Sequence, residues 1–418
     1  MTGWIRYRRS VGLADASCVL VAVLGLALLA GCRPEPAGLE DPASAPWNEV
    51  LDAARDREVH MMMWMGDPLI NQYMRTWVAP RLDSLFDITL TLVPAQGNEI
   101  VSRLVTEIEL GAGESAADLV WINGETFYQL RQADGLYGPF VDALPNAAYV
   151  ATQDPFIHTD FQQPVEGYES PWGSVQFVMI ADSARVTEVP RTRDALDTWI
   201  RAHPGRFTMD RSFTGLTFLK MLFIDMAGGM DRVTGPFRED VYAPVSDSLF
   251  SWLESLRPYF WREGRSFPEG VADLHRLFDA GQVDFSMSNN DGEVDNKVRQ
   301  GILPPGSFGW IPAFGSIRNT HFLGIPRLAS EKAAAMVVAD FLLGPEAQFH
   351  KQDPAIWGDG TVLDPAQLSP EWQRRFATAT ARRRTPAPAV LRANALPEPA
   401  PEFMIRLDED FRRRMVRP

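Results

Sequence analysis

Short apolar segments alternate with amphipathic helical segments along most of the chain, and this alternation limits the fold more than any other feature. In the clearest unit, residues 59–64 are typical of a buried strand, and Asp67 and Pro68 supply an N-cap and a first-turn proline for the helix that follows. Similar units begin with strands at 88–93 and 118–123. The pattern predicts an α/β fold with a mainly parallel sheet, in which binding sites lie beyond the carboxyl ends of the strands.

A second series of strand and helix units follows an apolar segment at 170–180, which predicts a strand that crosses from one lobe to another. Further strands are expected at 206–210, 282–288 and 321–326. We expect the last of these to return to the first lobe, and Ser330 to cap the helix after it. The sequence therefore predicts two lobes joined by crossing strands.

The amino-terminal end has the order of a bacterial lipoprotein signal. Arg6, Arg8 and Arg9 precede an apolar run that is too short to span a bilayer comfortably, and the run ends in Leu29-Ala30-Gly31-Cys32. After cleavage, Cys32 would carry acyl chains that hold the protein on a membrane, outside the cytoplasm, in the periplasm or at the cell surface. An ordinary cleaved signal and a short membrane anchor are the alternatives.

These patterns divide the chain into five parts. The predicted divisions are a signal peptide at 1–31, a tether at 32–46, a first lobe at 47–172 and 321–364, a second lobe at 173–320, and a C-terminal linker and helix at 365–418. The tether contains four prolines and no periodicity. The terminal helix, from Glu402 to about Met415, is expected to pack on a lobe.

Composition excludes several classes of function. The 418 residues contain only two cysteines, Cys18 and Cys32. Because the first would be removed with the signal and the second would carry the lipid, the folded body has no disulfide, no thiol nucleophile and no cysteine-bound metal. Removal of residues 1–31 takes away three arginines and one aspartate, which leaves 37 basic and 53 acidic residues and disfavours a nucleic-acid partner. Only four residues are lysines, which we attribute to codon usage rather than to an anion site.

Five segments, in a fixed order, carry a resemblance to a known family. They are Asp118-Leu-Val-Trp-Ile-Asn-Gly-Glu125, Ser170-Pro-Trp-Gly173 leading into Gln176, Gly281-Gln-Val-Asp-Phe-Ser-Met-Ser288, Phe322-Leu-Gly-Ile-Pro326 before Ser330-Glu-Lys-Ala-Ala, and Phe341-Leu-Leu-Gly-Pro-Glu-Ala-Gln348. Together they resemble the periplasmic solute-binding proteins of ABC transporters, in the thiamine, iron and polyamine branch and within it the YnjB-like subfamily, over about residues 47–364.

The resemblance implies a type II periplasmic-binding-protein fold. In this fold two α/β lobes are joined by crossing hinge strands, and the cleft between the lobes closes on a small ligand. The resemblance also implies that a permease and ATPase complex is the partner, and we expect a monomer. Iron is disfavoured as the ligand, because no two tyrosines are adjacent in the sequence.

The candidate ligand-binding residues lie at the predicted strand ends or in the loops beyond them. They are Trp64, Asp67, Trp121, Asn123, Glu125, Trp172, Gln176, Asp210, Ser212, Asn289, Asn290, Asp291, Trp310 and Phe314. Such a mixture of rings and carboxylates favours an organic cation, because a ring face attracts a cation by about 0.5–2 kcal/mol and a nearby carboxylate adds to this. We therefore expect a small polar ligand, thiamine-like or polyamine-like, and neither a cofactor nor a metal.

Several candidates also have a structural interpretation. Trp64 and Trp121 lie within apolar strands, and four candidates precede helices that they would cap: Asp67, Asp210, Asn289 and Asp291. Trp172 and Asn290, beside proline or glycine, are expected in exposed turns. The methionines at 61–63 are expected in the core rather than at a soft-metal site, because neighbours in a strand point to opposite faces.

No known catalytic motif is present. The sequence contains no Gly-x-Ser-x-Gly, no His-Glu-x-x-His and no Gly-Lys dipeptide of a phosphate-binding loop. A binding protein is therefore favoured over an enzyme. The alternatives are a lipoprotein hydrolase on an α/β scaffold, whose histidine, aspartate and serine meet only in space, and a surface adhesion or scaffold lipoprotein.

Overall fold

The computed structural model describes Met1 and residues 39–379 and 382–416. The predicted signal and Cys32 lie outside the described residues. Met1–Glu40 and Asp41–Pro418 form two separate units, and both lobes of the protein belong to the second of them. Among the described residues, no helix has both the length and the apolar character needed to cross a membrane.

The first sheet is built from the units at the start of the chain. Its strands are β1 (Arg57–Met63), β2 (Ile88–Pro94), β3 (Leu119–Ile122), β4 (Leu136–Tyr137), β7 (Glu169–Gln176), β11 (Ser316–Pro326) and β12 (Ala395–Leu396). Strand β1 pairs in parallel with both β2 and β3, and β3 pairs with β11 in the antiparallel sense. The parallel arrangement expected for β1 to β3 is confirmed, so the loops after these strands lie at one edge of the sheet.

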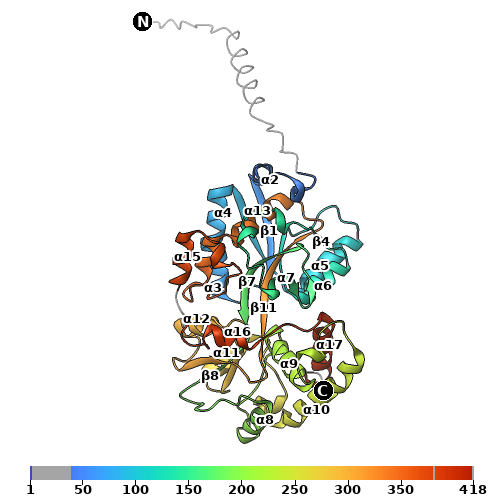
Figure 1. Ribbon diagram of the computed structural model, residues 1–418, viewed down its shortest axis with the longest axis vertical. Helices are drawn as coiled ribbons and strands as arrows, with labels where there is room; N and C mark the ends of the chain where they lie inside the picture. The colour runs from blue at the N-terminus through green and yellow to red at the C-terminus, as the bar shows by residue number, and fades with distance from the viewer. Residues whose placement is uncertain (2–38, 380–381, 417–418) are drawn as a thin grey trace. The chain divides into compact units, whose positions relative to one another are not determined.

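Helices surround this sheet and complete the first lobe (Figure 1). They are α2 (Trp47–Ala54), α3 (Pro68–Tyr73), α4 (Ala79–Phe86), α5 (Gly97–Glu109), α6 (Gly124–Gln132), α7 (Pro155–His158), α13 (Lys332–Leu343), α14 (Pro345–Lys351) and α15 (Pro370–Ala377). Met61, Met62 and Met63 are fully buried, as expected for core residues. Helix α13 begins after Glu331 rather than after Ser330, whose hydroxyl donates to the Asp118 carboxylate instead of capping the helix.

The second lobe has a different sheet from the one expected. Its strands are β8 (Val178–Asp182), β9 (Phe285–Ser288) and β10 (Ser307–Trp310), and its helices are α8 (Arg193–Ala202), α9 (Phe213–Met226), α10 (Glu239–Leu256), α11 (Val271–Asp279) and α12 (Glu293–Arg299). Strand β8 pairs with both neighbours in the antiparallel sense. The strand predicted at 206–210 is wrong, because this segment makes only one isolated bridge, from Phe207 to Phe260.

Strands β7 and β11 of the first sheet run side by side in the antiparallel sense and extend toward the second lobe (Figure 1). The continuous strand expected at 170–180 is in fact two strands, because Phe177 separates β7 from β8 and is buried in the core of the second lobe. The chain thus leaves the first sheet through β7 and returns to it through β11.

The last part of the C-terminal segment packs on the second lobe, whereas α15 lies against α14 in the first lobe and β12 pairs with β11 of the first sheet. Residues 388–416 form α16 (Pro388–Ala393), β12 and α17 (Pro401–Phe411), followed by a π-helical turn. Phe403, Leu407, Phe411 and Met415 are buried in the same hydrophobic cluster as α9 and α10. The packing expected for the terminal helix is confirmed.

Candidate functional site

The candidate site begins at the edge of the first sheet where β1, β2 and β3 end. Trp64 follows β1 directly, and its ring lies so close over Gly66 that a Cβ atom there would be 2.4 Å from Trp64 Cζ2. In the neighbouring loops, a Cβ at Gly97 would lie 2.6 Å from Thr126 Oγ1 and 3.5 Å from Glu125 Oε1. The loops after β2 and β3 are therefore in contact, as the sequence predicts.

Asp67 has two roles at this edge. Its Oδ1 accepts a hydrogen bond from the Leu69 backbone at 2.8 Å and so caps α3. Its Oδ2 lies 2.5 Å from Lys297 Nζ of α12, which belongs to the second lobe. A predicted ligand carboxylate thus forms a buried ion pair between the lobes.

Lys297 also belongs to a series of charged side chains in contact within the second lobe. Its Nζ lies 3.8 Å from Glu293 Oε1, and the same oxygen lies 3.5 Å from His275 Nε2. Burial opposes ionisation of Glu293, yet the hydrogen bond from His275 and the charges of His275 and Lys297 bring its pKa down to about 2. Glu293 is therefore ionised under all physiological conditions.

Asp210, Ser212, Thr214 and Asn289 form a polar corner at the start of α9. Asp210 Oδ1 accepts hydrogen bonds from the backbone of Ser212 at 2.8 Å and of Gly215 at 3.3 Å, while Asn289 Nδ2 donates to Thr214 Oγ1 at 3.1 Å. Burial raises the pKa of the Asp210 carboxyl against these bonds. Asp210 therefore caps the start of α9, as its structural interpretation predicts, and its role in ligand binding stays a prediction.

Glu125 lies in a second polar cluster, near the start of α6. Burial raises the pKa of Glu125, and the charge of Lys220 in α9 opposes this rise. Burial also raises the pKa of Asp160, and Glu125 and Glu398 raise it further by repulsion. Lys220 Nζ lies 2.5 Å from Glu398 Oε2, and the ring centroids of Phe161 and Phe213 are 4.5 and 4.9 Å away.

The crossing strands carry the remaining central candidates. The Gln176 backbone donates to Asp291 Oδ1 at 3.3 Å, and its side chain donates to the Leu391 carbonyl at 2.8 Å. Asp291 also pairs with Arg382. Asn290 uses its side-chain oxygen to accept from the Gly292 backbone at 2.8 Å.

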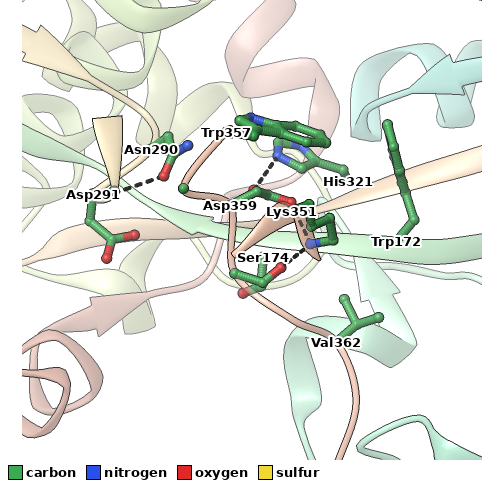
Figure 2. Close-up of polar contacts among 12 residues, drawn as sticks. Trp172, Ser174, Asn290, Asp291, His321, Lys351, Trp357, Asp359 and Val362 are labelled. Atoms are coloured by element: carbon green, nitrogen blue, oxygen red, sulfur yellow. Dashed lines mark hydrogen bonds and ion pairs between the residues drawn. The ribbon is translucent and has the colours of Figure 1, made fainter. Parts of the chain in front are cut away.

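Figure 2 shows a buried charge network beside these residues. Asp359 lies between Lys351 and His321, with Oδ2 2.7 Å from Lys351 Nζ and Oδ1 3.3 Å from His321 Nε2. Trp172 stands on β7 next to this network and is fully buried against Trp121, so its expected exposure in a turn is wrong. Strand β7 continues through Pro171 and Gly173, with a register shift at Trp172 in its pairing with β11, so neither residue opens a turn there.

Four candidates take other positions. Trp121 is half-buried and packs edge-on against Trp172 with centroids 5.1 Å apart. Trp310 is buried in the second core beside Phe285, whereas Phe314 lines a cavity of about 490 Å³ formed by the end of α9 and residues 393–396. Asn123 stands at the N-cap position of α6 but makes no side-chain cap bond.

Three predicted residues retain a buried acceptor atom that no partner satisfies within residues 39–379 and 382–416. These atoms are Glu125 Oε2, Asp210 Oδ2 and Asn289 Oδ1. An unpaired buried acceptor costs roughly 1–3 kcal/mol, so each would gain from a ligand that donates a hydrogen bond. The indole N–H groups of two further candidates, Trp172 and Trp310, are buried donors without a partner among the residues that the structure describes, so the unpaired groups include both acceptors and donors.

Sequence reasoning missed several charged residues of the region, namely Asp160, Lys220, His275, Glu293, Lys297, Lys351, Asp359 and Glu398. The sequence signal that could have pointed to some of these residues is that the chain has only four lysines. Three of the four lysines, Lys220, Lys297 and Lys351, are buried and each pairs with a carboxylate, so these three have a structural role.

The region offers little for catalysis. Ser286 Oγ lies 2.7 Å from His275 Nδ1, and Glu293 lies on the other side of the ring, but Ser286 and His275 are buried and the hydroxyl has no access to a substrate. Within the described part of the chain, no group of three or more histidine, cysteine or acidic side chains is arranged to hold a metal ion.

Comparison with known proteins agrees with this architecture. The sequence profile of the family described as bacterial extracellular solute-binding protein matches residues 80–380. The protein YnjB of Escherichia coli (strain K12) is 38% identical over 335 residues, which cover 79% of this chain and 86% of YnjB.

Solved structures share the fold at low sequence identity. The periplasmic binding protein AfuA from Actinobacillus pleuropneumoniae, with fructose-6-phosphate bound, has a TM-score of 0.61 at 12% identity and is matched over 98% of its chain and 86% of this one. A Listeria monocytogenes protein named as a spermidine/putrescine ABC transporter also has a TM-score of 0.61, at 14% identity, over 97% of its chain and 85% of this one.

At these identities the likeness to solved structures shows the fold alone, and the family follows from the profile and from YnjB. The two α/β lobes and the crossing strands agree with the family that the profile and YnjB indicate. The chain therefore belongs to the bacterial extracellular solute-binding proteins, and it is a solute-binding component of an ABC transporter.

Proposed function

We propose that the protein captures a small organic cation between its two lobes and delivers it to a permease and ATPase complex. The observation that carries this proposal is the set of unpaired buried acceptors at Glu125, Asp210 and Asn289. A cation with N–H donors satisfies these atoms, and the two carboxylates neutralise its charge. A thiamine-like or polyamine-like ligand has this chemistry.

Proton linkage gives the proposal a specific signature. Burial raises the pKa of Glu125 and of Asp210, so each carboxyl holds its proton to a higher pH than in water. A bound cation favours the ionised form, so binding expels protons and becomes tighter as the pH rises above the ordinary carboxyl range. Titration calorimetry in buffers of different ionisation enthalpy measures the protons released.

A thermal-shift screen tests the ligand class. The panel contains thiamine and its phosphates, putrescine, spermidine, neutral sugars and divalent metals. Ligand at 100 times its dissociation constant adds about 2.7 kcal/mol of stability, so a binding cation raises the melting temperature measurably. Stabilisation by sugars but by no organic cation would contradict the proposal.

Matched variants test the site. Glu125→Gln and Asp210→Asn keep the size of each side chain and remove its charge, so each should weaken cation binding by about tenfold or more and reduce proton release. Asp142→Asn, on an exposed turn of the first lobe, is the control. If both site variants bind the cation as the unmodified protein does, the assignment of these two residues is wrong.

We also propose that Cys32 carries a lipid anchor and that residues 32–46 tether the protein, as a monomer, close to its permease. A short tether raises the local concentration of a captured ligand at the transporter without requiring high affinity. Metabolic labelling with palmitate should label the unmodified chain and not Cys32→Ser, and only the former should sediment with membranes. Equal labelling of the two would exclude this anchor.

A further inference from the structure

Helix α12 makes several close polar contacts with the first lobe. Lys297 Nζ lies 2.5 Å from Asp67 Oδ2, and one residue earlier Asn296 Nδ2 donates to the Trp357 carbonyl at 2.8 Å. At the start of the helix, a Cβ on Gly292 would be 1.9 Å from the Gly358 carbonyl. The helix therefore meets both the loop after β1 and the loop after α14.

The Asp67–Lys297 pair is the only one of these contacts between two charged groups. The two side chains are 9% and 5% exposed, so solvent screens their attraction much less than it screens a surface pair. Either charge, left without its partner at such a site, would be strongly disfavoured. Movement of the lobes away from each other must therefore break this pair and hydrate both groups.

The same lysine is connected to the proposed ligand site. Lys297 contacts Glu293, and Glu293 contacts His275, whose charge acts on the Asp210 carboxyl. On the other side of the crossing strands, Tyr128 of α6 donates to Glu402 of α17 at 2.9 Å (Figure 1), and the Gly235 backbone donates to Gln162 Oε1 at 2.7 Å. Both contacts are more exposed than the Asp67–Lys297 pair, and neither joins two charged groups.

We propose that Lys297 is a positioning residue that closes the cleft: its ion pair with Asp67 determines how long the two lobes remain together. The inference rests on the proposed function only in assuming that the ligand lies between the lobes. The closing contact itself is a property of the protein without ligand, and it is measured without one.

Single-molecule energy transfer tests this in the full chain with Cys18→Ser and Cys32→Ser, so that two introduced cysteines are the only ones. Ser84→Cys on α4 and Ser251→Cys on α10 place dyes on exposed positions of the two lobes. Lys297→Met keeps the length of the side chain, and Asp67→Asn keeps the cap on α3, since asparagine caps as well as aspartate does. Each variant should shorten the dwell time of the high-transfer state by about tenfold.

The double variant Asp67→Asn/Lys297→Met should shorten the dwell time by no more than the single variants do, because each of them already breaks the pair and leaves one charge without its partner. Lys332→Met, whose lysine donates to Ala329 within the first lobe, should leave the dwell time unchanged. Unchanged dwell times in both single variants, or additive effects in the double variant, would overturn the inference. Should the dwell times shorten while no cation binds, the proposed function would fail and the closing role of Lys297 would stand.

Discussion

Replacement of Lys220 by methionine should destabilise the second lobe by several kcal/mol. The ammonium is fully buried in α9, 2.5 Å from the Glu398 carboxylate of the C-terminal segment and over the rings of Phe161 and Phe213. Lys220→Met fills most of the same volume, so the change creates little cavity. The cost comes from Glu398, which keeps a donor from Asn319 but loses its neutralising charge.

Breaking a buried ion pair by removing one partner costs about 3–5 kcal/mol. For a cooperative unit of 150–250 residues each kcal/mol lowers the melting temperature by roughly 2–4 °C, so a drop of about 10 °C is expected. The double variant Lys220→Met/Glu398→Gln removes both charges of the pair, and its glutamine still accepts from Asn319. It should therefore be more stable than Lys220→Met alone.

Differential scanning calorimetry at pH 7 measures Lys220→Met, Glu398→Gln and the double variant, with Lys332→Met as a lysine control outside the second lobe. The reasoning is refuted if Lys220→Met melts within about 1 °C of the unmodified protein. It is also refuted if the double variant loses the sum of the two single losses, because a coupled pair is not additive.

Two further predictions concern stability. Burial raises the pKa of Asp340 to about 6, so the folded state keeps a proton that the unfolded state has released, and stability should fall by roughly 3 kcal/mol as the pH rises from about 4 to 6. Urea titrations across this range should show the fall, and Asp340→Asn should abolish it. Gly124→Ala should cost about 1–3 kcal/mol in the same titrations, because the new Cβ would lie 1.9 Å from the Phe161 ring; Gly113→Ala, with open space around it, should cost much less.

Local signals predicted the first lobe well. The aspartate and proline at 67–68 begin a helix because a side-chain oxygen and a preset backbone angle act within three residues, and the structure has that cap. The second lobe was predicted less well. The segment 206–210 has the composition of a strand but finds no partner strand, and Trp172 is buried because β7 lies beneath the loop that carries Trp357.

The candidate site divides in the same way. Glu125, Asp210 and Asn289 were found because they follow strands or begin helices, which the sequence displays directly. Their lysine neighbours were not found, because nothing near Lys220 or Lys297 in the sequence indicates a partner.

The strand and helix units of the first lobe, the family and the loops of the proposed site were readable in the sequence, because each depends on residues within one turn or one strand of each other. Only the tertiary structure decided which charges meet. Lys220 and Glu398 are 178 residues apart in the chain, and Asp67 and Lys297 are 230 apart. Such pairs form because a buried charge loses its hydration and needs an opposite charge nearby. The packing of the lobes determines which opposite charge is close enough.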